Sequence, residues 1–183
     1  MNKNIEIEAK YMVGKEDFLK LQEALNLYIK DGFVQTNDYF DTIDKKLHQK
    51  KWMLRVRAIN NSSYELTVKK PHSDGREETN IDIDLKEYER IKKEGTVSLE
   101  GFEGLILESE GKLTTYRNSK SYKDGELFLD ENHYNGIIDY EVEYEVRTSL
   151  EEAEKIVKEL FKEVGITNYK VSESKHKRCC YNK

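Results

Sequence analysis

The sequence predicts an α+β protein in which eight antiparallel strands close into a β-barrel, with helices packed outside it. Three observations support this fold class. Hydrophobic residues recur with period two along much of the chain, turn signals separate consecutive strands, and charged residues fill the alternate positions of several strands. The chain has 183 residues, one proline and no internal repeat or low-complexity linker. We therefore expect a single domain, residues 1–183.

The expected strands alternate apolar with polar residues, as half-buried strands do. Asp124-Gly125 and Asn135-Gly136 supply turn signals between the last three of them. The expected strands span residues 5–13, 33–42, 52–59, 64–70, 76–85, 112–123, 126–134 and 137–147.

About four helices are expected beside these strands. Phe18, Leu21 and Leu25 recur with helical spacing and predict an amphipathic helix over residues 15–27. The stretch 86–110 predicts two short helices, divided near Gly95. A last amphipathic helix begins after Ser149, a favourable N-cap residue, and ends before Gly165.

The composition limits the function classes. Charged residues make up 37% of the chain, yet the net charge is only −5, so a nucleic-acid partner is disfavoured. No apolar run approaches the roughly 20 residues of a membrane span, which predicts no membrane partner. Cys179 and Cys180 are adjacent and cannot cross-link a scaffold, which favours a reducing, cytoplasmic location. The oligomeric state, monomer or homodimer, stays open.

Charged residues alternate along the strands in a way that needs an explanation. Glu6, Glu8 and Lys10 share one strand face, Arg55 and Arg57 share another, and four carboxylates alternate over residues 139–145. On an open sheet this would be the solvated face. In a closed barrel the same residues line the lumen, where charges must be matched by opposite charges, ions or a ligand. Acids and bases mixed in this way suit a bound polyanion with divalent cations.

Several motifs in order resemble the CYTH domains, the triphosphate tunnel metalloenzymes. The resemblance runs from Glu6 to Lys175, essentially the whole chain. It rests on the ExExK start Glu6-Ile7-Glu8-Ala9-Lys10, Tyr39-Phe40-Asp41-Thr42, Leu54-Arg55-Val56-Arg57, Leu66-Thr67-Val68-Lys69, Arg76-Glu77-Glu78, Tyr116-Arg117, Leu129-Asp130 with Tyr134, Glu141-Val142-Glu143 and Ser174-Lys175.

The resemblance implies a tunnel whose basic residues bind a triphosphate while its acidic residues hold Mg²⁺ or Mn²⁺. The implied substrate-binding residues are Lys10, Arg55, Arg57, Lys69, Arg117 and Lys175. The implied metal ligands are Glu6, Glu8, Glu78, Asp130, Glu141 and Glu143. We expect the catalytic contribution to come mainly from Glu8, Lys10, Arg57 and Lys69.

Two assignments remain open between neighbours. Glu141 and Glu143 are taken as the ExE pair because of their spacing after Asp130, with Glu145 as the alternative partner of Glu143. Glu78 is preferred to Glu77 because it is in phase with Asn80 and Asp82 along its strand.

The predicted function is divalent-metal-dependent hydrolysis of inorganic triphosphate or a small organic or nucleoside triphosphate, a small-molecule substrate. The alternatives are a class IV-type adenylyl cyclase that forms cyclic AMP and pyrophosphate, and a non-catalytic polyphosphate- or nucleotide-binding module. An RNA 5′-triphosphatase is disfavoured because the net charge of −5 does not suggest a basic surface for a long RNA.

The remaining reactive residue types predict no further site. The four histidines, His48, His72, His133 and His176, lack metal-ligand spacing and are expected on the surface or in loops. The Lys-rich tail after Lys175 is expected to be a solvated terminus in which Cys179 and Cys180 are incidental. A P-loop is not predicted, because the sequence has no Gly-rich phosphate loop.

Overall fold

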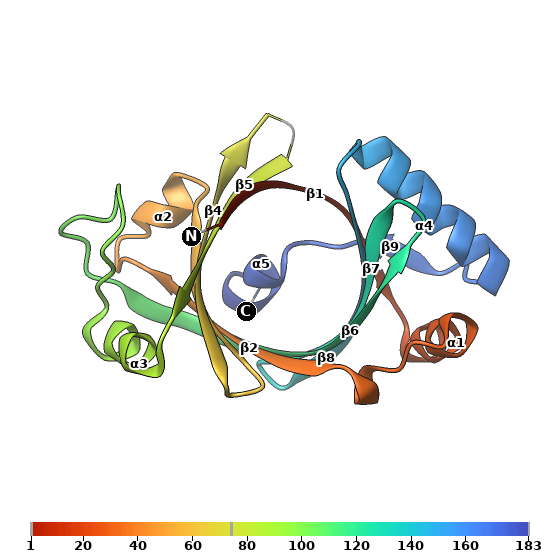
Figure 1. Ribbon diagram of the computed structural model, residues 1–183, viewed down its shortest axis with the longest axis horizontal. Coiled ribbons are helices and arrows are strands. Elements are labelled where there is room, and N and C mark those ends of the chain that lie inside the picture. The colour runs from red at the N-terminus through yellow and green to blue at the C-terminus, as the bar shows by residue number, and fades with distance from the viewer. Residues whose placement is uncertain (1, 74, 183) are drawn as a thin grey trace. The chain divides into compact units, whose positions relative to one another are not determined.

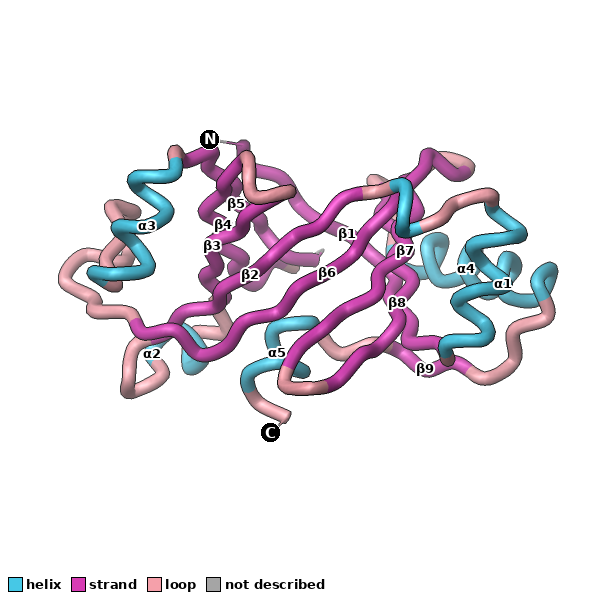
Figure 2. Tube along the Cα trace, turned by 90° about the horizontal axis from the view of Figure 1, so that it is seen from below, coloured by secondary structure: helices cyan, strands magenta, loops and turns pink. Residues whose placement is uncertain are grey.

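The structure is a computed structural model that describes residues 2–73 and 75–182 (Figures 1 and 2). Its strands are β1 (Asn2–Val13), β2 (Phe33–Asp41), β3 (Met53–Ile59), β4 (Ser63–His72), β5 (Gly75–Ile83), β6 (Glu108–Tyr122), β7 (Gly125–Tyr134), β8 (Ile137–Val146) and β9 (Tyr169–Val171). Its helices are α1 (Lys15–Leu25), the 3-10 turn η1 (Ile29–Asp31), α2 (Lys46–Gln49), α3 (Leu85–Glu94), α4 (Leu150–Val164) and α5 (Lys175–Cys180).

Hydrogen bonds join the strands into one sheet in the order β5-β4-β3-β2-β6-β7-β8-β1-β9, and β5 also pairs with β1. The strands β1 to β8 therefore form a closed ring, which confirms the predicted eight-stranded β-barrel. The strand pairs β1–β8, β3–β4, β4–β5, β6–β7 and β7–β8 are antiparallel. The short β9 is an addition to the predicted strands and pairs with the end of β1.

The chain divides into two compact units. Unit 1 comprises Met1–Ile5, Thr36–Leu113 and His176–Lys183, and unit 2 comprises Glu6–Gln35 and Thr114–Lys175. The prediction of a single domain stays a prediction. None of the helices formed by residues 2–73 and 75–182 is long and apolar enough to cross a membrane.

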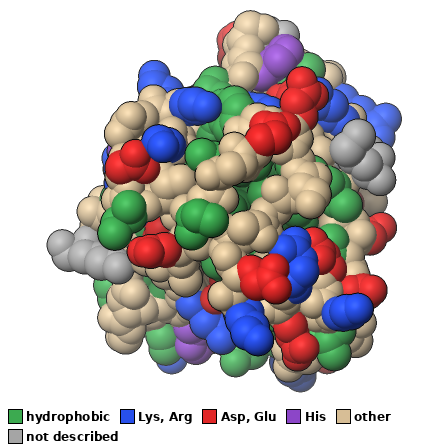
Figure 3. Space-filling model, turned by 90° about the vertical axis from the view of Figure 1, so that its left-hand side faces the viewer, with side chains coloured by type: hydrophobic (Ala, Val, Ile, Leu, Met, Phe, Trp, Pro, Cys, Tyr) green, Lys and Arg blue, Asp and Glu red, His purple; other side chains and the backbone are tan. Residues whose placement is uncertain are grey.

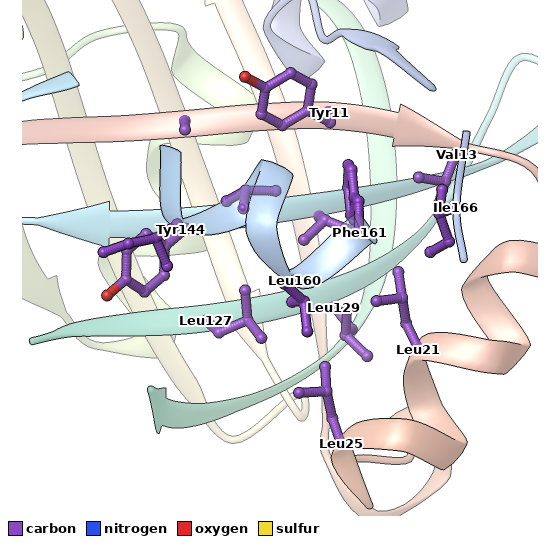
Figure 4. Close-up of a cluster of buried hydrophobic side chains, with 14 of the residues drawn as sticks. Tyr11, Val13, Leu21, Leu25, Leu127, Leu129, Tyr144, Leu160, Phe161 and Ile166 are labelled. Carbon is purple, nitrogen blue, oxygen red and sulfur yellow. The ribbon is translucent and has the colours of Figure 1, made fainter. Parts of the chain in front are cut away.

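In unit 2 the helices α1 and α4 lie side by side and cover the apolar sheet face (Figures 2 and 4). Leu21 of α1 and Phe161 of α4 pack against alternate residues of β1, β7 and β8. The rings of Phe161 and Tyr11 meet edge to face with 5.7 Å between their centroids. Ser149 caps α4 by accepting a hydrogen bond from the amide of Glu152, as predicted.

In unit 1 the helix α3 covers the apolar face of β3, β4 and β5, and Ile91 is fully buried there. Asp84 caps α3 by accepting a hydrogen bond from the amide of Glu87 at 2.7 Å.

The face of the molecule in Figure 3 carries acidic and basic side chains interspersed, without a continuous basic surface.

The expectation of a second helix within residues 86–110 is wrong. After α3 ends at Glu94, the chain turns through Gly95, Gly101 and Gly104, all of which have positive φ angles. No helix forms between α3 and β6, and β6 begins at Glu108, four residues before the predicted start. The apolar residues Phe102 and Leu107 still enter the core, which explains the misleading hydrophobic pattern.

The expectation of a solvated, incidental tail is also wrong. Residues 175–180 form α5, in which Cys179 is fully buried and Arg178 is 8% exposed. A β-carbon at Gly111 of β6 would lie only 3.0 Å from the sulfur of Cys179, so the absence of a side chain there lets α5 lie directly on β6. A six-residue helix in a basic run carries too weak a hydrophobic period to be predicted.

The core of unit 2 depends on the buried face of α1. Replacing Leu21, which is fully buried, by alanine should lower the free energy of unfolding by about 2–5 kcal/mol through lost contacts and a cavity. The matched control is Leu19→Ala on the exposed side of the same helix, where the change should stay within about 0.5 kcal/mol. Urea unfolding followed by circular dichroism measures the free energy of unfolding of both variants. Equal losses in Leu21→Ala and Leu19→Ala would contradict this packing.

Candidate active site

In unit 2 the strands β6, β7, β8 and β1 present polar side chains on the sheet face opposite to α1 and α4. Arg117 pairs with Asp130 in register, Asp130 with Glu141, and Lys10 with Glu143. Residues directly opposite each other on neighbouring strands share a face. The register therefore brings the predicted residues of these four strands onto one surface.

Three carboxylates form the centre of this face. Oxygen atoms of Asp130, Glu141 and Glu143 lie within 4.8 Å of one another, although Asp130 and Glu141 are fully buried and Glu143 is 8% exposed. Three buried negative charges at this spacing repel strongly unless cations lie between them. We call these residues the acidic triad.

Lys175 and Arg117 supply those cations. The ammonium group of Lys175 lies 2.8 Å from Oδ2 of Asp130 and 2.7 Å from Oε2 of Glu141, and it also contacts Glu143. Arg117 donates two hydrogen bonds of 2.6 Å to the carboxylate of Asp130 and contacts Glu143 as well. The acidic triad is thus stabilised by a surrounding of positive charge.

The pKa values follow from this arrangement. Burial alone would raise the pKa of Glu143, but Lys175, Arg117 and Lys10 outweigh it and hold that pKa well below its usual value. Burial would lower the pKa of Lys175, and the three carboxylates raise it instead. Both side chains therefore remain ionised throughout the neutral pH range.

The ExExK residues of β1 belong to the same face. The ammonium group of Lys10 lies 2.6 Å from Oε1 of Glu8. Burial lowers the pKa of Lys10, but Glu8, Glu143 and Glu141 raise it above its usual value. Glu6, two residues before Glu8 on the same strand face, is half-buried. Glu145 is half-buried opposite Glu8 and Glu126 and lies outside the acidic triad.

In unit 1 the strands β3, β4 and β5 carry the other predicted residues on the face opposite to α3. Nζ of Lys69 lies 2.6 Å from Oε2 of Glu78, its partner in register. Burial would raise the pKa of Glu78, but Lys69 and Arg55 lower it to about 2. Glu77 is half-buried and pairs instead with Lys3 at 3.0 Å, so Glu78 is the carboxylate that joins Arg55 and Lys69.

Two buried hydrogen-bond donors on this face have no acceptor among residues 2–73 and 75–182. Arg55 is 7% exposed, and its Nε has no hydrogen-bond partner within the described part of the chain. The same holds for Nδ2 of Asn37 on β2, whose Oδ1 accepts a hydrogen bond of 2.7 Å from Nε of Arg57. Buried donors without acceptors are costly, so their presence points to a ligand that supplies oxygen atoms.

Asn37 and Ser172 are among the polar residues of these faces that sequence reasoning missed. Asn37 orients Arg57 in unit 1, and Ser172 in unit 2 donates a hydrogen bond of 2.6 Å to Glu141. The alternation of Gln35, Asn37 and Tyr39 along β2 could have indicated Asn37. Ser172 lies in an irregular segment after β9, where the sequence carries no periodic signal.

Comparison with known proteins identifies the family. The family model described as the CYTH domain matches residues 4–179. The chain belongs to the CYTH domain family. The Bacillus subtilis (strain 168) protein named "Putative triphosphatase YjbK" is 36% identical over 154 residues, which cover 79% of this chain and 79% of that protein.

Two solved structures are also similar to this chain. A Bacillus halodurans protein, described as a "putative adenylate cyclase", is 35% identical with a TM-score of 0.86, over 97% of this chain and 98% of that one. The Hippeastrum protein described as "Putative adenylyl cyclase HpAC1" is 23% identical with a TM-score of 0.76, over 93% of both chains, and shows the fold alone.

The acidic triad of the CYTH chain depends on balanced buried charge. Glu143→Gln leaves the cations Lys175 and Arg117 short of a partner and should lower the free energy of unfolding by about 3 kcal/mol. Glu145→Gln, two residues further on the same strand face, should change it by less than about 1 kcal/mol. Urea unfolding in metal-free buffer measures the free energy of unfolding of both variants. A larger loss in Glu145→Gln than in Glu143→Gln would contradict the placement of Glu143 in the acidic triad.

The charge of Glu78 should make stability pH-dependent. Its pKa is about 2 in the folded chain and ordinarily 4.5, so its ionisation stabilises the fold above pH 4.5 and ceases to do so as pH falls towards 2. Glu78→Gln should lower the free energy of unfolding by about 3 kcal/mol at neutral pH, and this loss relative to the wild-type protein should shrink as the pH falls from 4.5 to 2. Glu77→Gln is the control. A loss of unfolding free energy in Glu78→Gln that did not change with pH would refute the expectation.

Proposed function

We propose that this chain is a divalent-metal-dependent triphosphatase that hydrolyses inorganic triphosphate or a small organic or nucleoside triphosphate. The observation that carries the proposal is the pair of buried donors in unit 1, Nε of Arg55 and Nδ2 of Asn37, that lack acceptors among the described residues. A phosphoryl group offers several oxygen acceptors and a charge opposite to that of Arg55. Membership of the CYTH family and likeness to a protein named as a triphosphatase support the same function.

The basic residues of unit 1 have the chemistry of phosphate recognition. The guanidinium groups of Arg55 and Arg57 each present a planar fork of donors that matches two phosphate oxygens. Lys69 is a compact point charge already held by Glu78 at 2.6 Å. We propose that these three residues bind phosphoryl oxygens, with Asn37 fixing the orientation of Arg57 through its 2.7 Å hydrogen bond.

The acidic triad fits a hard divalent cation. Mg²⁺ and Mn²⁺ prefer carboxylate oxygens, and Asp130, Glu141 and Glu143 offer oxygens within 4.8 Å of one another. The cluster is built around positive charge, which the ammonium group of Lys175 supplies in the structure. We propose that Asp130, Glu141 and Glu143 hold the metal, with Glu6 and Glu8 as further candidates in unit 2 and Glu78 as a separate candidate ligand in unit 1. A bound divalent cation would neutralise phosphate charge.

The residues of the chain would act by positioning and charge. Phosphoryl transfer requires little covalent chemistry from a protein, because stabilising charge on the non-bridging oxygens lowers the barrier. We propose that Arg57 and Lys69 of unit 1 provide positive charge for phosphoryl oxygens. Lys10, Arg117 and Lys175 of unit 2 are proposed for the same role. Glu8 holds Lys10 at 2.6 Å and is proposed to orient either that amine or the attacking water.

A second candidate function is the adenylyl cyclase reaction. It is favoured by one observation, the 35% identity to the Bacillus halodurans protein described as a putative adenylate cyclase. In a cyclase the ribose 3′-oxygen attacks the α-phosphorus of ATP, and the products are cyclic AMP and pyrophosphate. The hydrolase releases orthophosphate, so product analysis with ATP separates the two functions.

A phosphate-release panel tests the proposal. Inorganic triphosphate, thiamine triphosphate, ATP and pyrophosphate are each offered with Mg²⁺, with Mn²⁺ and with EDTA, and the products are analysed for cyclic nucleotide. We expect orthophosphate release from at least one triphosphate with either metal and none with EDTA. Release of cyclic AMP alone would favour the cyclase, and no turnover of any triphosphate would overturn an enzymatic function.

The same phosphate-release assay tests whether the positive charge of Arg57 contributes to catalysis. Arg57→Ala should lower kcat about 100-fold or more, because it removes a donor to the transferred phosphoryl group. Arg147→Ala, at an exposed position just after β8, is the matched control and should keep full activity. Circular dichroism establishes that both variants are folded, and near-normal activity of a folded Arg57→Ala protein would contradict the assignment.

A further inference from the structure

A second cluster of potential metal ligands lies in unit 1, and the proposed function does not use it. It consists of Glu110 on β6 and of His176 and Cys180 on α5. Nε2 of His176 lies 2.9 Å from Oε2 of Glu110, and one ligand atom from each of the three residues lies within 4.8 Å of the other two. Carboxylate, imidazole and thiol groups thus meet at one point.

The helix places two of these ligands. His176 and Cys180 lie four positions apart, so they project from the same face of α5. Two ligands at this spacing on one helical face form a recurrent zinc-binding arrangement. Glu110 comes from β6, next to Gly111, whose missing side chain leaves room for the sulfur of Cys180. The ligands are therefore brought together by packing of α5 on β6.

The donor set selects the metal. A thiolate and an imidazole are softer ligands than carboxylates, and their combination favours Zn²⁺ over Mg²⁺ or Mn²⁺. The acidic triad in unit 2, which consists of oxygen ligands alone, has the opposite preference. Ligand chemistry thus distinguishes the two clusters of this chain.

The cluster needs little adjustment to hold zinc. Tetrahedral coordination at metal–ligand distances near 2.0 Å separates a nitrogen from an oxygen ligand by about 3.3 Å, so His176 and Glu110 would part by a few tenths of an ångström. Lys45, which bonds Glu110 at 2.7 Å, is 48% exposed at its side chain and can turn to solvent at little cost. Tyr181 donates a hydrogen bond of 2.9 Å to Glu110 and can remain as an orienting neighbour.

We propose that Glu110, His176 and Cys180 form a zinc site that fastens α5 to β6. Zinc would bind the thiolate of Cys180, Nε2 of His176 and a carboxylate oxygen of Glu110, with water at the fourth position. The thiol proton of Cys180 is released to solvent when the zinc–sulfur bond forms. The proposed zinc joins two elements of the fold and takes no part in the proposed triphosphatase reaction.

Cobalt and zinc titrations of the full chain test the proposal. The protein is stripped with EDTA, dialysed under reducing conditions and titrated with Co²⁺ in the presence of excess Mg²⁺, which competes at oxygen-only sites. We expect thiolate-to-cobalt charge-transfer absorption that saturates at about one equivalent and is displaced by Zn²⁺. Absence of this absorption in the wild-type protein would overturn the proposal.

Matched cysteine variants identify the ligand. Cys180→Ser should abolish the charge-transfer absorption and weaken Zn²⁺ binding at least 10-fold, measured by competition with a chromophoric chelator. Cys179→Ser is the control, because the sulfur of Cys179 faces the carbonyl of Lys112 and lies outside the cluster. Retention of the absorption in Cys180→Ser, or its loss in a folded Cys179→Ser protein, would contradict the assignment.

A third variant keeps the test independent of the thiols. His176→Asn should weaken Zn²⁺ binding to a similar degree and remove the rise in melting temperature that Zn²⁺ gives the wild-type protein. His72→Asn, at an exposed histidine at the end of β4 and outside the cluster, should retain both effects. Equal zinc stabilisation of the wild-type and His176→Asn proteins would refute the site.

Discussion

The structure depends on the neutralisation of buried charge on one face of its sheet. In each unit one sheet face is apolar and packs against helices, while the other carries ionised side chains that are largely buried. Burial of a single unmatched carboxylate or ammonium group costs several kcal/mol. The polar faces are stable because acids and bases alternate across neighbouring strands, as Lys69 with Glu78 and Arg117 with Asp130 show. The register of the strands is therefore fixed by charge as well as by hydrophobic contact.

The same charge pairing bears on ligand binding. Glu78, Asp130 and Glu143 hold the basic side chains Lys69 and Arg117 at defined positions, so little side-chain entropy would be lost if these basic side chains bound an anion. In unit 1 the pairing is incomplete, since Nε of the buried Arg55 finds no acceptor among the described residues. A face with its cations fixed and some donors unsatisfied is preorganised for an oxygen-rich anion.

The sequence alone predicted most of the strands because alternation is a local signal. The alternation of Leu54 and Val56 with Arg55 and Arg57 indicates which side of the strand is apolar without reference to the rest of the chain. The segment after α3 misled the prediction because Phe102 and Leu107 pack from turns, where their spacing has no helical meaning. Such packing depends on contacts distant in sequence, which no local pattern records.

Site residues were predictable to the extent that motifs carried them. The register of β6, β7 and β8 brings Arg117, Asp130 and Glu141 together, as the resemblance implied. Ser172 was missed because it lies in an irregular segment without a periodic signal. Asn37 was missed because alternation gives only the strand face of a neutral polar residue and not its contact with Arg57. The His176–Cys180 spacing was visible in the sequence, but it gains meaning only when the tail is known to be helical.

The connectivity of the sheet has a consequence for folding order. Strands β3 to β5 and β6 to β8 form two meanders of successive hairpins, whose partners lie close along the chain. The first strand instead pairs its residues 7–13 with residues 140–146, so this pairing closes a loop of well over a hundred residues. Closing so long a loop has a high entropic cost before any contact is gained, which makes it a late event. During synthesis on the ribosome β1 emerges well before β8, so the β1 edge that pairs with β8 stays uncovered until the barrel closes.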